Sequence, residues 1–379
     1  MESSRRRLSG AAIALFVLAS SMFSPAAAAG PLHGTALRIA DFLLAQQDPA
    51  GAIPDAPGSK RVNEDSNMEY ALIGLAAAYD TSGDPKYLTG LDAGIAWLAA
   101  REEMIDPAWK GTWFYAYRSS PPYEPIPTSP GGDVEDVRGV DATSALFAYL
   151  VGLRDRVTNT TAASMAYAPQ VHAALDFLLA HNLRTGGYFA SSWQLRSGVW
   201  KRWNFAYAAD QGDVYLGLRA GSLMYGDAPY TSAADFLGVN VPPDFSTGPR
   251  FALGMDARGN LDTSMGGFNS IWPQGYLPWV FGANPADRRS TRWLDSRVRS
   301  DGAVAVSPRA PTFSLSAAIL AMSRPSIGLP PPAPTLRWLV REACDPISVG
   351  VHDVGGSGPL YDNVAGFSVV ALLDFPAWG

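Results

Sequence analysis

Residues 67–79 read Asn-Met-Glu-Tyr-Ala-Leu-Ile-Gly-Leu-Ala-Ala-Ala-Tyr, a run in which almost every position is apolar or small. A helix of this composition is apolar on nearly all of its faces. Such a helix is stable only where other elements surround it on every side. We therefore expect this segment to be an inner helix, enclosed by an outer layer.

Similar segments recur at intervals of roughly 45 to 75 residues, and an internal repeat of this kind indicates an architecture of repeated units. The inner segments are 67–79, 141–153, 212–224, 270–281, 311–322 and 363–373. Each follows an apolar helix that ends in Phe-Leu or Trp-Leu, at Phe42-Leu43, Trp97-Leu98, Phe177-Leu178, Phe236-Leu237, Trp293-Leu294 and Trp338-Leu339. The repeat predicts six helical hairpins.

Six hairpins with alternating outer and inner helices predict an all-α fold, the (α/α)6 toroid. An open solenoid would instead need polar capping repeats at both ends, and the sequence shows none. Short alternating stretches at 187–190 and 303–306 predict small β-ribbons in the loops. No long Pro/Ser-rich linker divides the chain, so we expect residues 30–379 to form one domain.

The first 29 residues have a different composition and predict a secretory signal peptide. Arg5, Arg6 and Arg7 form a positive head, residues 10–23 an apolar core and residues 25–29 a small-residue cleavage site. We expect a secreted or periplasmic protein, with the general secretory and twin-arginine routes both open. No later apolar run approaches the ~20 residues of a membrane helix, so we expect no membrane span after cleavage.

Composition excludes several functions. The chain has 379 residues, a net charge of −6, one cysteine and four histidines. An acidic chain binds nucleic acid poorly, and Cys344 has no intrachain partner for a disulfide or a cysteine zinc site. Only His352, beside Asp353 in the last long loop, is placed to reach a site among the loops. Residues 256–262 resemble a calcium loop but lack its acidic third position, so we expect a turn there. We expect neither a metal nor another cofactor.

Acidic residues gather at the starts of the inner helices, where the long loops of a toroid meet. Each acid is also a normal helix cap, and Ser66 with Glu69 forms a formal capping box. Capping does not explain acids in at least four of six hairpins. Converging carboxylates have pKa values pushed apart, as acid–base cleavage of a glycosidic bond requires. The candidate catalytic residues are Glu64, Asp65, Glu69, Asp141, Asp210 and Asp213.

The same loops are rich in aromatic residues. Aromatic rings suit the flat faces of sugars, although core packing of long loops also uses them. The candidate substrate-binding residues are Trp113, Tyr115, Trp193, Trp203, Tyr207 and Trp272.

The architecture and the helix-start acids resemble the (α/α)6 carbohydrate-active enzymes, which include inverting endoglucanases and chitosanases, unsaturated glucuronyl hydrolases and toroidal polysaccharide lyases. Residues 64–74 are similar to the endoglucanase-type segment that opens the first inner helix with a general-acid Glu. Residues 140–146 are similar to the segment that opens the second with Asp. The Glu-Gly pair of those families is missing here, because Asp65 follows Glu64.

The resemblance implies a glycoside hydrolase acting on an oligo- or polysaccharide. The acid would be Glu64, Asp65 or Glu69. The base would come from Asp210 or Asp213 across the loops, and Asp141 would fix a sugar hydroxyl.

Three alternatives remain open. A polysaccharide lyase would use a base and a cation that neutralises a uronate, for which Arg138, Lys201 and Arg202 with Tyr207 are candidates. A non-catalytic glycan-binding or assembly protein of the cell envelope is the second. A terpene-cyclase-like toroid ranks last, because the chain lacks an Asp-x-Asp-Asp motif.

Overall fold

A computed structural model of the chain describes residues 30–127, 133–265, 268–282, 284–305, 312–343, 350–352 and 359–378. All structural statements below concern these residues. The expected signal peptide at 1–29, Cys344 and Asp353 lie outside them.

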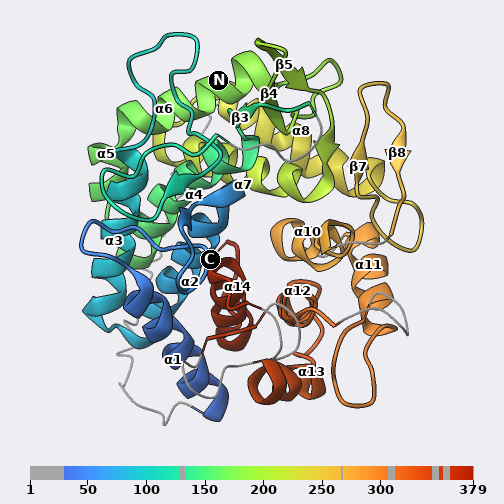
Figure 1. Cartoon of the computed structure of the whole chain (residues 1–379). Helices are drawn as coiled ribbons and strands as arrows, with labels where there is room; N and C mark the ends of the chain where they lie inside the picture. The colour runs from blue at the N-terminus through green and yellow to red at the C-terminus, as the bar shows by residue number, and fades with distance from the viewer. Residues whose placement is uncertain are drawn as a thin grey trace, which may run out of the picture.

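The main helices form six outer–inner pairs (Figure 1). The pairs are α1 (Pro31–Gln46) with α2 (Asn67–Ser82), α3 (Pro85–Ala99) with α4 (Asp141–Thr158), α6 (Ala168–Phe177) with α7 (Ala208–Tyr225), α8 (Ala228–Asp244) with α10 (Pro273–Phe281), α11 (Pro285–Asp295) with α12 (Ser314–Ser326), and α13 (Ala333–Trp338) with α14 (Asp362–Leu373). The shorter elements η1 (Glu64–Ser66), α5 (Ala162–Ala166), η2 (Leu178–Asn182), α9 (Phe268–Ile271) and η3 (Leu339–Ala343) flank them.

The inner helices form a closed ring. Each of α2, α4, α7, α10, α12 and α14 contacts the next, and α14 returns to contact α2 and α1. Every residue of α14 is buried, as the composition of the inner segments predicts. The (α/α)6 toroid is therefore confirmed, and each predicted inner segment overlaps an inner helix.

Glycines bring neighbouring inner helices into backbone contact at three places. A Cβ on Gly366 of α14 would lie 2.2 Å from the carbonyl oxygen of Tyr70 in α2. The same holds between α7 and α4 at Gly217 and between α10 and α12 at Gly275, where the nearest backbone oxygen would lie at 2.3 and 2.5 Å. No larger residue fits these crossings without separating the helices.

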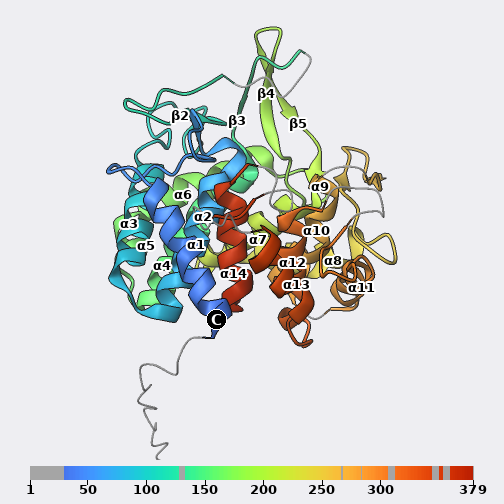
Figure 2. The same cartoon turned by 60° about the horizontal axis from the view of Figure 1, so that its bottom comes forward.

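Three small antiparallel sheets lie among the loops at one end of the ring (Figure 2). They are β1 (Arg61–Val62) with β2 (Tyr117–Arg118); β3 (Asp136–Arg138), β4 (Ser192–Arg196) and β5 (Val199–Trp203); and β6 (Ala206–Tyr207), β7 (Gly254–Met255) and β8 (Leu261–Asp262). At the ribbons expected at 187–190 and 303–306, the described residues, which do not include Val306, form isolated bridges, such as Leu183 with Phe189 and Val298 with Val304.

The calcium-like segment 256–262 includes the turn between β7 and β8. Asp256 Oδ1 accepts hydrogen bonds from the backbone amides of Arg258 and Asn260, so this carboxylate holds the turn. Within the described part of the chain, no helix is both long and apolar enough to cross a membrane.

Candidate active site

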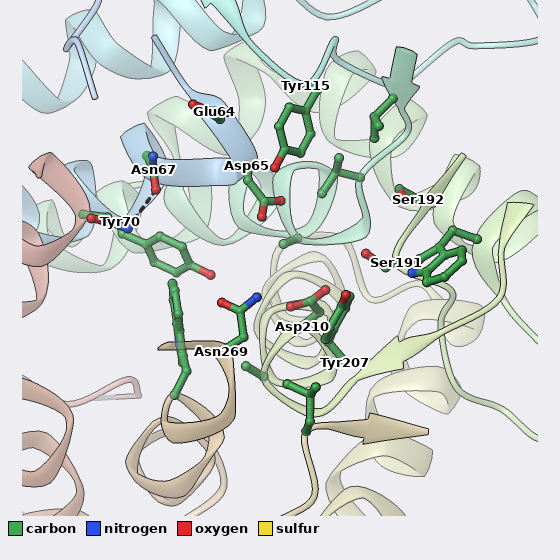
Figure 3. Close-up of a pocket in the computed structure, with 18 of the residues that line it drawn as sticks. Glu64, Asp65, Asn67, Tyr70, Tyr115, Ser191, Ser192, Tyr207, Asp210 and Asn269 are labelled. Atoms are coloured by element: carbon green, nitrogen blue, oxygen red, sulfur yellow. Dashed lines mark hydrogen bonds between the residues drawn. The ribbon is translucent and has the colours of Figure 1, made fainter. Parts of the chain in front are cut away.

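A cavity of about 510 Å³ opens among the loops, over the starts of the inner helices (Figure 3). Residues from α2, α4, α7, α9 and α14 and from the loops between the helices contribute to its wall. The polar and aromatic lining residues are Glu64, Asp65, Asn67, Tyr70, Tyr115, Ser191, Ser192, Gln194, Trp203, Tyr207, Asp210, Asn269, Trp272, Tyr361 and Asn363. The cavity thus joins carboxylates, amides, hydroxyls and aromatic rings.

The segment before α2 presents Asp65 to this cavity through an unusual backbone. Asn63, Asp65 and Ser66 have φ angles of 56°, 53° and 69°, all in the left-handed region. Non-glycine residues there are uncommon and cluster at functional sites, where the surrounding structure holds them.

Buried polar contacts hold this backbone in place. Asn63 Oδ1 accepts the amide of Met68 at 3.1 Å, and Asn63 Nδ2 donates to Glu69 Oε1 at 3.1 Å. Ser66 Oγ bonds to Thr143 Oγ1 at 2.9 Å, across to α4. The expected capping box is wrong, because Ser66 is left-handed and its side chain does not cap α2. Glu69 is fully buried, does not line the cavity and supports the loop.

Asp65 and Asp210 point into the cavity from opposite walls, Asp65 before α2 and Asp210 in the first turn of α7 (Figure 3). Water reaches Asp65 through the cavity mouth, but protein surrounds the carboxyl elsewhere. This desolvation, with the charge of Glu64, raises the pKa of Asp65 to about 6. Burial and the neighbouring charge of Asp65 raise the pKa of Asp210 well above its ordinary range. The two carboxyls therefore titrate apart.

Two more of the six candidate acids lie outside the cavity lining, as Glu69 does. Asp213 is fully buried and accepts hydrogen bonds from the hydroxyls of Tyr70, at 2.9 Å, and Tyr276. Burial raises its pKa to about 8, against the effect of both tyrosines. Asp141 is also fully buried, and its Oδ1 accepts the amide of Ala142. Both acids lie outside the cavity lining, so neither is placed to touch a ligand there.

Glu64, in contrast, does line the cavity. Its carboxylate pairs with Arg61, three residues earlier, and its backbone amide donates to Asp55 Oδ1 at 3.1 Å. Of the six candidate acids, the structure brings Glu64, Asp65 and Asp210 to the cavity.

The candidate aromatic residues divide in the same way. Tyr115, Trp203, Tyr207 and Trp272 line the cavity. Trp113 instead packs in the core, where its indole N–H donates to Leu98 O at 2.8 Å.

Trp193 also stays out of the cavity lining. It packs edge-on against Trp109 and donates to Asn182 Oδ1 at 3.2 Å.

Sequence reasoning missed the amides and hydroxyls of the wall, namely Asn67, Tyr70, Ser191, Ser192, Gln194, Asn269, Tyr361 and Asn363. Asn67 is the first residue of α2 and Asn363 the second residue of α14, and Asn363 Nδ2 donates to Asn67 Oδ1 at 2.8 Å. This bond joins the two ends of the ring at the cavity wall. In the sequence, an asparagine near the start of both helices was the signal that could have predicted these wall residues.

The described residues contain no group of three or more His, Cys, Asp or Glu side chains arranged to hold a metal ion. The basic candidates for uronate neutralisation also lie outside the cavity lining. Arg138 pairs with Glu103 at 3.2 Å, and Arg202 donates to the backbone oxygens of His181 and Leu183.

No protein-family model and no curated protein sequence matches this chain. Solved structures do. The unsaturated glucuronyl hydrolase from Bacillus sp. GL1, responsible for the degradation of glycosaminoglycan, has a TM-score of 0.63 at 16% identity, over 90% of this chain and 95% of that chain. A D-mannose isomerase has a TM-score of 0.64 at 10% identity, over 90% and 97%. A possible GH105 family member from Salmonella enterica serovar Paratyphi A has 0.61 at 12%, over 91% and 93%. At these identities the likeness establishes the toroidal fold alone.

Proposed function

We propose that this protein is an exported glycoside hydrolase that cleaves an oligo- or polysaccharide in the cavity between Asp65 and Asp210. The observation that carries the proposal is this facing pair, in which the charge of Asp65 helps to raise the pKa of Asp210. Two carboxyls with separated pKa values can hold one proton and one negative charge at the same pH, which glycosidic hydrolysis requires.

The different exposure of the two carboxyls supports a division of roles, because Asp65 is exposed and Asp210 is half-buried. Asp210, the less exposed of the two, keeps its proton and donates it to the glycosidic oxygen as the bond from that oxygen to the sugar C1 breaks. Asp65 is ionised above pH of about 6 and takes a proton from the water that attacks C1. The assignment reverses the sequence-based expectation, in which the first hairpin supplied the acid and the third the base.

The remaining acids act through other residues in this proposal. Asp213 holds the hydroxyl of Tyr70, a lining residue, and Asp141 supports the start of α4 beside the lining residues Val140 and Ala142. The fold agrees with the proposal, because unsaturated glucuronyl hydrolase and the possible GH105 member share it. A lyase is less well supported, because Arg138, Lys201 and Arg202 all lie outside the cavity lining, and Arg138 and Arg202 are engaged by other groups.

The test is hydrolysis of a panel of neutral, amino and acidic oligosaccharides by the purified mature protein. Release of reducing ends without an ultraviolet-absorbing product supports hydrolysis, whereas such a product identifies a lyase. Asp210→Asn and Asp65→Asn should each lower kcat by at least about 10²-fold, as removal of a general acid or base does. Asp235→Asn, an exposed position on α8, is the matched control and should keep full activity. Equal activity in all three variants would exclude the proposed pair.

A further inference from the structure

The hairpin formed by β4 and β5 projects beyond the ends of the helices of the ring (Figure 2). In its register Ser192 pairs with Trp203, Gln194 with Lys201, and Arg196 with Val199. Directly paired residues lie on the same side of a sheet, and so do residues two positions apart. These six residues therefore form one face, which we call the open face.

The opposite face of the hairpin is packed. Trp200 and Trp193 lie with ring centroids 4.7 and 6.1 Å from that of Trp109. Arg202 donates from the same side to two backbone oxygens, those of His181 and Leu183. Strand β3 also pairs with β4, so the hairpin is part of a three-stranded sheet. These contacts hold the hairpin rigidly against the body of the protein.

The open face begins at the cavity, where Ser192 and Gln194 are only 5% and 9% exposed, and becomes exposed toward the hairpin tip. Ser192, Gln194 and Trp203 line the cavity, and Lys201 and Val199 follow toward the hairpin tip. Trp203 is 40% exposed and Val199 55% exposed. An exposed tryptophan held on a rigid strand at the edge of a pocket has the properties of a binding platform.

The chemistry of this face suits a sugar ring. The Trp203 ring offers a flat apolar surface, and the Arg196 guanidinium lies 6.0 Å from its centroid. Gln194 and Lys201, directly opposite each other, add hydrogen-bond donors beside the ring. A platform flanked by donors binds both the apolar face and the hydroxyl edge of a saccharide.

We infer that the open face of the hairpin is a second sugar-binding subsite, so that the substrate is an oligosaccharide that fills the cavity and continues along Trp203 and Lys201. This inference rests on the proposed function, because the same glycan occupies both places. It adds that chain length beyond the cleaved bond contributes to recognition.

The test compares chain lengths in one glycan series that the wild type hydrolyses, from disaccharide to tetrasaccharide. Lys201→Ala combined with Val199→Ala, both outside the cavity lining, should lower kcat/KM about tenfold for the tetrasaccharide, the effect of losing one hydrogen bond and one apolar contact. For the disaccharide it should change less than about twofold, since such a chain ends at the cavity. Lys110→Ala, an exposed lysine outside the hairpin, is the control and should leave both values unchanged. Equal losses for both lengths, or no loss for either, would overturn the inference.

A binding measurement separates this inference from the proposed function. Calorimetry with Asp210→Asn measures affinity for the same two oligosaccharides without turnover. Tighter binding of the tetrasaccharide that disappears with Lys201→Ala and Val199→Ala supports the subsite, even if the wild type proves to hydrolyse nothing. Equal affinity for both lengths overturns the subsite and leaves the hydrolase proposal untouched.

Discussion

Replacing Gly366 with alanine tests the closure of the inner ring most directly. The new Cβ would lie 2.2 Å from Tyr70 O, 2.7 Å from Tyr70 C and 2.8 Å from Ala71 Cα. All three are backbone atoms, so no change of rotamer can relieve the contact, and α14 must move away from α2. Overpacking of a core costs about 1–3 kcal/mol, and we expect the upper part of this range here.

Alanine is also favoured over glycine within a helix by about 1 kcal/mol, which offsets part of this cost. We therefore expect Gly366→Ala to lose about 2 kcal/mol of unfolding free energy, and the melting temperature to fall by roughly 4 °C. The assay is thermal unfolding followed by circular dichroism. Gly34→Ala on α1, where nothing lies within 4 Å of the new Cβ, is the control and should melt slightly higher than wild type. Equal shifts in the two variants would refute the argument that the α2–α14 contact limits the size of residue 366.

Three further predictions concern the site. The wild-type kcat/KM should rise as pH increases through about 6, because Asp65 must lose its proton to act as the base, and Glu64→Gln should move this inflection to lower pH in the rate profile. The pKa of Glu69 is raised from 4.5 to about 8, so its contribution to stability is present below about 4.5 and is lost as pH rises through 8; urea unfolding at pH 5 and 8 should show this decline in wild type and a smaller one in Glu69→Gln. Tyr70→Phe and Tyr276→Phe each remove one donor to Asp213 and should lose about 1–3 kcal/mol in urea unfolding, but only Tyr70→Phe should also lower kcat; equal kcat losses would remove the special role of Tyr70.

The fold could be predicted from the sequence because the composition of the inner helices indicates that other helices surround them on every side. Residues 71–78 have no polar face to offer water, so a ring within a ring follows from burial alone. The ends of the helices are harder to predict. Helix α7 begins at Ala208, four residues before the expected start, which places Asp210 in its first turn.

The candidate site was predicted in location but not in detail. Asp210 and Asp213 are three residues apart and were expected to share one face toward the ligand. Protein surrounds α7 on all sides, so a position only three residues after Asp210 already lies in the interior. There Asp213 accepts hydrogen bonds from the hydroxyls of two tyrosines. The left-handed backbone at Asn63, Asp65 and Ser66 is set by tertiary contacts that no local pattern reveals.

The seam between α2 and α14 has a consequence for biosynthesis. Asn363 and Val364 complete the cavity wall beside residues that are translated some 300 positions earlier. The hydrogen bond from Asn363 to Asn67 shows this contact. N-terminal hairpins can begin to fold while translation continues, but the wall stays unfinished until α14 has emerged from the exit tunnel. A nascent chain therefore has no complete cavity until this helix has emerged and packed against α2.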